Sequence, residues 1–321
     1  MIELLEQFIP AADEVGWLQR GEDAECRLFQ QVAEQGHYAG RVKPTNTRQG
    51  IYATTASGIM LASINTRSAE QVIDMLERAL ARWSELSEEE RRLDDDTLRA
   101  VTSTRRWEHL YPEDGLVLRV DSRDLPREID PRPENDWRRN ARNRDLLWFT
   151  RDEALALVPA DDTPGSSRDW PAHLANRVVC LNLVDNVCGQ VPAFESDHAQ
   201  QASIRSVVDS VDGNVVRVRI EGRTRAVVAG RWSVDGFNDM NDPSQQERGI
   251  ETRILGFAEF DRLTQKFTAF EMVAIGTRWG ATQYNGRTDD AEPAGIGYLF
   301  LLAEPHERAA PAFMWRYGWR K

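Results

Sequence analysis

Residues 203–221 read SIRSVVDSVDGNVVRVRIE, and their pattern indicates how the C-terminal part folds. Val216, Val218 and Ile220 alternate with charged side chains, which is the period of a strand that buries one face and exposes the other. Asp212-Gly213 precedes this strand and is typical of a tight hairpin turn. The sequence therefore predicts an antiparallel hairpin with one solvated face.

Further strands are predicted on the C-terminal side of this hairpin. Residues 252–260 and 266–275 form a second apolar pair joined by a short polar loop, and residues 295–303 add a fifth strand. Some of these segments carry apolar residues on both faces. Because a second layer or closure would bury both faces and hide open edges, we expect a β sandwich or a partly closed β barrel.

The N-terminal part has helical periods instead. Apolar residues recur at helical spacing over 68–83, where Ser68 and Gln71 predict a capping box, and over 22–35, which ends at Gly36. Between these helices, residues 50–55 and 59–64 predict a strand hairpin. The chain is therefore predicted to be an α+β protein.

Three segments are expected along the chain. Residues 1–90 form the α/β segment, residues 201–321 form the β domain, and the acidic run at 85–96 marks the first boundary. Residues 91–200 contain many prolines and predict a mixed, largely irregular connecting region with short helices. A length of 321 residues is consistent with more than one core.

Composition excludes several function classes. The formal net charge of −12 opposes binding to nucleic acid, because that association depends on neutralising phosphates. No apolar run approaches the roughly 20 residues of a membrane-spanning helix. Three cysteines and the absence of a secretory pattern at residue 1 predict a cytoplasmic protein, unless a signal has been removed.

The segment 49–61, QGIYATTASGIML, resembles the strand-turn-strand pattern in the second half of the thioredoxin fold. With GHY at 36–38, PTNTRQG at 44–50 and GTRWG at 276–280, the chain is similar to an uncharacterised family of bacterial proteins with a thioredoxin-like N-terminal segment. That family has no established activity. The catalytic Cys-x-x-Cys of thioredoxins is absent here, because Asp23 and Phe29 stand where a partner of Cys26 would lie, so the resemblance implies a fold and no dithiol chemistry.

Two groups of residues are weak candidates for catalysis. Cys26 lies in the first turn of a predicted helix and is a candidate nucleophile, with His37 as its base. Acidic neighbours and the apolar helix face favour an inert, buried thiol instead. Cys188 and His198 are candidates for a metal site, but their spacing matches no established ligand motif, so no metal or other cofactor is expected.

Two polar loops are the preferred candidates for ligand binding. The first contains Asn46, Thr47, Arg48 and Gln49, and the second contains Arg278, Trp279, Tyr284 and Asn285. Such loops combine donors, amides and rings at the ends of strands, where ligands often bind. The alternative is structural: the first loop caps its own backbone, and Trp279 closes the end of the core.

The sequence contains no signature that names a reaction. The leading hypothesis is a non-catalytic binding or interaction protein that uses an aromatic-lined cleft of the β domain for a small molecule or a protein. The alternatives are a thiol-dependent enzyme that uses Cys26 and a metal-dependent enzyme. The sequence does not decide whether the chain is an enzyme, nor its oligomeric state.

Overall fold

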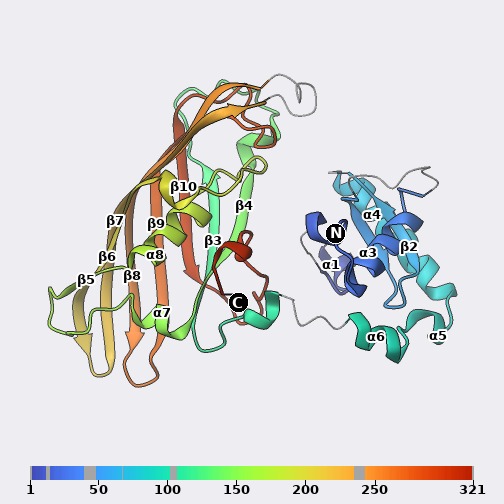
Figure 1. Cartoon of the computed structure of the whole chain (residues 1–321), viewed down its shortest axis with the longest axis horizontal. Helices are drawn as coiled ribbons and strands as arrows, with labels where there is room; N and C mark the ends of the chain where they lie inside the picture. The colour runs from blue at the N-terminus through green and yellow to red at the C-terminus, as the bar shows by residue number, and fades with distance from the viewer. Residues whose placement is uncertain are drawn as a thin grey trace. The chain divides into compact units, whose positions relative to one another are not determined.

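The computed structural model describes residues 2–11, 15–39, 48–66, 68–101, 107–234 and 243–319. The chain divides into two compact units, Met1–Arg106 and Trp107–Lys321. Residues 107–200, expected to form most of a separate connecting region, therefore belong to the same unit as the C-terminal strands (Figure 1).

The first unit is a small α+β structure. Its helices are α1 (Ile2–Leu5), α2 (Val15–Leu18), α3 (Ala24–Gln35), α4 (Ala69–Glu85), α5 (Glu88–Arg91) and α6 (Asp95–Val101), and its strands are β1 (Ile51–Thr54) and β2 (Met60–Ile64). The two long helices and the antiparallel hairpin are confirmed. The acidic run at 85–96, expected to mark the first boundary, lies inside this unit, which ends at Arg106. It contains α5, which begins with the capping box of Ser87 and Glu90, and the start of α6.

The start of α4 differs in one detail from the expected capping box. Ser68 accepts a hydrogen bond from the Gln71 N–H at 3.4 Å, as predicted. The Gln71 side chain does not return to the Ser68 N–H, because it accepts from the Thr66 hydroxyl at 2.6 Å. The Thr66 hydroxyl oxygen instead accepts a hydrogen bond from the Ser68 N–H at 3.1 Å, so the N–H groups of Ser68 and Gln71 both have an acceptor.

The second unit is built on one antiparallel sheet in the order β4-β3-β10-β9-β8-β7-β6-β5. The strands are β3 (Leu116–Asp124), β4 (Arg142–Phe149), β5 (Ser167–Asp169), β6 (Ala199–Asp212), β7 (Val215–Trp232), β8 (Ser244–Asp261), β9 (Lys266–Trp279) and β10 (Ala294–Leu302). The hairpin at 212–215 is confirmed, and Gly213 supplies the positive φ of +58° that its tight turn needs. The helical pieces are η1 (Trp107–Leu110), η2 (Trp137–Asn140), α7 (Arg151–Leu155), α8 (Ala172–Arg177), η3 (Val178–Asn182), η4 (Ser196–His198) and η5 (Met314–Arg316).

The expectation of a largely irregular region at 91–200 needs correction. This region supplies β3 and β4, and both lie at one side of the sheet. The prolines that suggested irregular structure lie outside these two strands, at positions 112, 126, 131, 133 and 159. Proline removes a ladder hydrogen bond only within a strand, so prolines that flank strands are compatible with a sheet.

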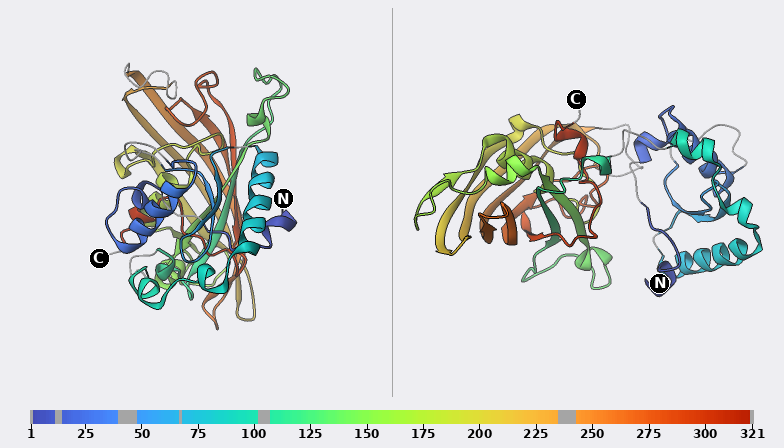
Figure 2. Two further views of the ribbon diagram at one scale, coloured as in Figure 1. Left: turned by 90° about the vertical axis from the view of Figure 1, so that its right-hand side faces the viewer. Right: turned by 90° about the horizontal axis from the view of Figure 1, so that it is seen from below.

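The sandwich and barrel expectations also need correction. The strands form a single sheet that is not closed, because its end strands β4 and β5 pair with β3 and β6 and not with each other. The sheet is twisted and curved, and the helical segment of α7, α8 and η3 lies on one face of it (Figures 1 and 2). Helices therefore provide the covering layer that a second sheet was expected to provide.

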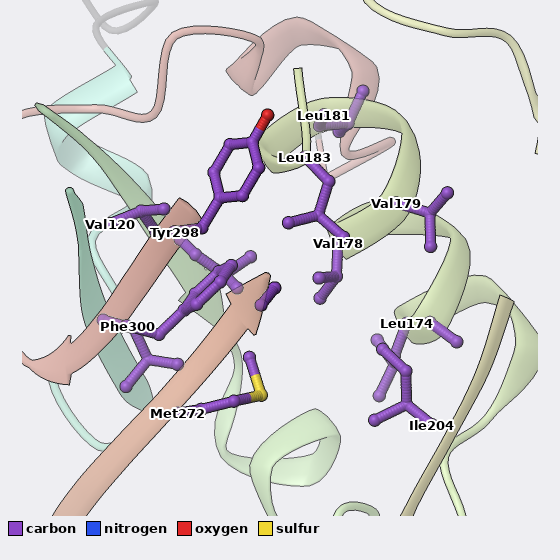
Figure 3. Packing of buried hydrophobic residues seen from close by; sticks show 14 of the residues in the cluster. Val120, Leu174, Val178, Val179, Leu181, Leu183, Ile204, Met272, Tyr298 and Phe300 are labelled. Carbon is purple, nitrogen blue, oxygen red and sulfur yellow. The ribbon is translucent and has the colours of Figure 1, made fainter. Parts of the chain in front are cut away.

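The core of the second unit lies between the covered face of the sheet and this helical segment. Val120, Phe300 and Met272 form adjacent cross-strand pairs, and each is almost completely buried. Val178 and Leu183 of the helical segment point toward these side chains (Figure 3). Burial of large apolar side chains on this scale is the main source of stability for such a unit.

Side chains form hydrogen bonds with backbone groups on the free edge of β4. The Trp148 carbonyl accepts from Arg177 at 3.0 Å, the Trp148 N–H donates to the Tyr317 hydroxyl at 3.5 Å, and the Leu146 carbonyl accepts from Asn182 at 3.2 Å. An exposed strand edge would otherwise invite pairing with another chain. The sheet therefore ends at β4, and the same contacts fix Arg177 and Tyr317 in position.

Candidate functional site

A pocket of about 570 Å³ lies where α8, η3, η4 and η5 meet. Its floor is made of buried side chains and its rim of more exposed polar ones. The residues that line it are His173, Asn176, Arg177, Cys180, Leu181, Phe194, Glu195, Ser196, Arg316 and Tyr317. This volume falls in the range of about 300–1,000 Å³ that is typical of sites for small organic molecules.

The π-helical turn η3 positions two residues of the pocket floor. It is a π-helix of five buried residues, and the Leu183 N–H donates to the Val178 carbonyl at 2.9 Å. The wider turn directs Val178 and Leu183 toward the sheet, while Leu181 points away from it (Figure 3). Cys180 and Leu181 therefore face the pocket. Short π-helical turns are frequent at functional sites.

Arg177 forms a fixed part of the floor. Its guanidinium donates to Glu153 at 2.8 and 2.5 Å and lies 4.5 Å from the centre of the Tyr317 ring. Although burial opposes ionisation of Glu153, Arg177 holds the pKa of that carboxyl below its usual value. Arg177 is thus a rigid, neutralised cation that orients Tyr317, and its charge is not available to a ligand.

Phe194 is the second ring of the floor. Its ring has the Arg248 guanidinium 4.2 Å from its centre, and Arg248 also donates to the Pro192 carbonyl at 2.8 Å. Burial lowers the pKa of Arg248 to about 10. Phe194 and Tyr317 are both almost fully buried, so the floor offers two rings held in place by arginines.

The rim contains one ion pair and several unused polar groups. Glu195 and Arg316 pair at 2.6 Å, and this contact lowers the pKa of Glu195. The side chains of His173, Asn176 and Ser196 make no hydrogen bond to the parts of the chain that the structure describes. Donors and acceptors that have no partner beside an apolar floor are free to orient a ligand.

Cys180 is the one thiol in the pocket among the described residues. Its Sγ lies 3.5 Å from the Glu195 carbonyl oxygen, to which it donates. Burial, with a contribution from the Glu195 charge, raises the pKa of Cys180 to about 11. The thiol is therefore protonated at neutral pH, which disfavours nucleophilic chemistry.

The predicted loop at 278–285 has structural contacts. Arg278 is fully buried and donates to the Asp290 carboxylate at 2.5 Å, and the Trp279 indole donates to Glu247 at 3.0 Å. Asn285 is buried, where its Oδ1 accepts from the Thr282 N–H at 2.9 Å, whereas Tyr284 is half exposed. None of these four residues lines the pocket.

Arg278 belongs to a buried ionic network centred on Arg287. All three nitrogens of the Arg287 guanidinium donate, to Asp124, Asp185 and Asp290, at 2.8 to 3.0 Å. Burial opposes the charge of Arg287, but Asp124 and Asp185 raise its pKa. Burial likewise opposes ionisation of Asp290, yet neighbouring arginines lower its pKa to about 2.

The N-terminal candidates lie in the first unit. His37 stacks on Tyr52 with 5.1 Å between ring centres, and its Nε2 lies 3.3 Å from the Gln49 carbonyl oxygen. Arg48 is buried and pairs with Glu34 at 2.8 Å. The Cys26 thiol is completely buried. Asn46 and Thr47 lie outside the described residues.

The two residues proposed for a metal site make different contacts. Cys188 lies against Gly286 beside the Arg287 network, and burial raises the pKa of its thiol to about 11. His198 accepts from the Glu195 N–H at 3.0 Å through Nδ1. Within the described residues no three metal-binding side chains form a group.

The sequence predicted none of the pocket residues as a ligand site. They come from positions 173–181, 194–196 and 316–317. The available signal was the apolar run at 178–181, which predicts a buried segment shortly after the helix start at Pro171. Nothing in the sequence indicates that Glu195 and Arg316 meet.

In the described parts of the chain, no helix is both long and apolar enough to cross a membrane. Comparison with known proteins gave no match to any protein-family model, curated protein or solved structure.

Proposed function

We propose that this chain is a non-catalytic binding protein whose pocket in the second unit holds a small amphiphilic molecule. The apolar part of the ligand packs on Leu181, Phe194 and Tyr317. Its polar group takes hydrogen bonds from the rim side chains. The observation that carries this proposal is the combination of a buried ring floor with rim donors and acceptors that have no partner in the described chain.

Several features favour binding over catalysis at this pocket. The one thiol that lines it has a pKa raised to about 11, and the one carboxylate among its lining residues, Glu195, is paired with Arg316. A general acid or base works best with a pKa near the working pH, so these two groups are poorly suited to that role. The two enzyme alternatives, through Cys26 and through a metal at Cys188 and His198, have no observation that favours them.

We also retain the thioredoxin-like relationship of the first unit as a proposal. The chain order α3, β1, β2, α4 and the antiparallel pairing of β1 with β2 support it. We assign no redox role to this unit, because its cysteine, Cys26, is completely buried and has no partner cysteine in the pattern.

Anilinonaphthalene sulfonate is a suitable probe, because it has fused rings and one anionic group. Ser196 is exposed on the rim, so Ser196→Trp places a ring over the mouth without disturbing the core. We expect it to weaken probe binding to the full chain by roughly tenfold or more, a loss of about 1.4 kcal/mol. Fluorescence titration measures this directly.

Ser84→Trp is the matched control. Ser84 is also exposed, and it lies in α4 of the first unit, outside both the pocket lining and the sheet. The control should bind the probe like the unchanged protein. Equal binding by all three proteins would place the probe elsewhere and remove support for the pocket.

A further inference from the structure

The outer face of the sheet, opposite the helical segment, carries a continuous apolar patch. Directly paired residues of neighbouring antiparallel strands lie on the same face, and Leu255, Val273 and Leu299 form such a row across β8, β9 and β10. The adjacent rows contain the remaining apolar members. The outer patch consists of Leu255, Phe257, Val273, Ile275, Leu299 and Leu301.

Three of its members are exposed although they lie on central strands of the sheet, whereas Val273, Leu299 and Leu301 are partly buried. Phe257 is 56% exposed, Ile275 is 50% exposed and Leu255 is 48% exposed. These residues belong to the strands whose two-sided apolar character suggested a sandwich. Since helices cover only the other face, the outer patch has no covering layer within the described residues of the second unit (Figure 2). Contiguous exposed patches of this kind mark interaction sites.

The charges around the patch identify the partner's chemistry. Arg223 and Arg253 are direct cross-strand neighbours, so two like charges face each other, which destabilises a sheet by about 0.2–1 kcal/mol. Neither arginine has an ion pair within the described residues. In the rows that contain the patch, the arginines are Arg119, Arg123, Arg142, Arg144, Arg205, Arg219, Arg223 and Arg253, and the carboxylates are Asp121, Asp169, Glu221 and Glu271. This face thus has excess positive charge in a chain of net charge −12.

We propose that the outer patch docks an acidic amphipathic segment of a partner protein. The partner's apolar side chains cover Phe257 and Ile275, and its carboxylates pair with Arg223 and Arg253. A second copy of this chain is disfavoured as the occupant, because it would bring the same excess of arginines against itself. A flat lipid surface fits poorly to a sheet whose neighbouring strands are rotated by roughly 20–25°.

The probe for this proposal is a fluorescein-labelled amphipathic helix of about 14 residues, with leucine on one face and glutamate on the other. Fluorescence anisotropy with the full chain should show saturable binding that weakens as salt is added. Arg223→Thr with Arg253→Thr should weaken binding by roughly fivefold or more, and Phe257→Ser with Ile275→Thr by roughly tenfold or more. All four positions are exposed, so the variants should remain folded, which circular dichroism checks.

Controls separate this proposal from the alternatives. A peptide with lysine in place of glutamate should not bind, and Ser196→Trp should leave binding of the acidic peptide unchanged. Peptide binding that is insensitive to both double variants would overturn the proposal. Binding to phosphatidylserine vesicles, or dimerisation seen in sedimentation, that the Phe257→Ser variant abolishes would overturn it in favour of a membrane or a second copy.

Discussion

The second unit contains two sets of arginine–carboxylate pairs, and they differ in what surrounds them. In the buried network, Arg287 is 0% exposed and binds three aspartates. On the outer face, Arg217 pairs with Glu259 at 2.9 Å, but the two side chains are 55% and 39% exposed. The chemistry is the same in both places. Burial therefore determines how much the loss of an ion pair lowers the free energy of unfolding, since water screens the exposed pair and cannot screen the buried one.

The largest expected effect comes from breaking the buried network. Arg287→Met leaves Asp185 without an ion pair among the described residues and removes the cation that it shares with Asp124 and Asp290. A buried charge that loses its partner costs about 3–5 kcal/mol. The free energy of unfolding, measured with urea, should fall by this amount for the second unit. A loss below about 1 kcal/mol would show that the aspartates are hydrated or protonated at little cost.

Arg217→Met is the matched exposed control for that experiment. It removes the same side chain from a pair of similar geometry on the outer face. The expected change in the free energy of unfolding is at most about 1 kcal/mol. If the two variants lose equal stability, burial is not the deciding factor.

A smaller, pH-dependent effect is expected at Asp145, whose pKa is raised to about 6. Burial is the main cause, and the N–H groups of Ala312 and Leu146 oppose it in part. The folded state therefore binds a proton more tightly than the unfolded state, so the contribution of Asp145 to stability is largest below about pH 4 and is lost as pH rises to about 6. Asp145→Asn should remove up to about 2–3 kcal/mol of this pH dependence. Urea unfolding of both proteins at several pH values measures it; identical pH profiles would contradict the assignment.

Local patterns in the sequence predict the elements that depend on local physics. The period of Val216, Val218 and Ile220 predicts β7, and Ser68 predicts the start of α4. The prolines between residues 112 and 159 led to a prediction of irregular structure where β3 and β4 lie. A single sequence does not show whether a proline lies within a strand or just outside it. The face on which apolar residues stay exposed also cannot be read from alternation alone.

The candidate site could not be predicted from the sequence for a different reason. Arg177, Phe194 and Arg316 are brought together because η3 packs against the sheet and the C-terminal segment contacts β4 through Tyr317. Arg278 and Asn285 are residue types that often bind ligands, which is why the sequence predicts a binding loop. The structure shows instead that Arg278 binds Asp290 and that Asn285 binds Thr282 in the interior. Contacts across such sequence distances have no local pattern.

The most direct test of the central claim is a crystal structure of the full chain with anilinonaphthalene sulfonate bound. We predict that its rings lie against Leu181, Phe194 and Tyr317, with the sulfonate at the rim near His173 and Asn176. A probe found only on the outer patch, or a pocket that stays empty at saturating probe, would contradict the claim that this pocket is the ligand site.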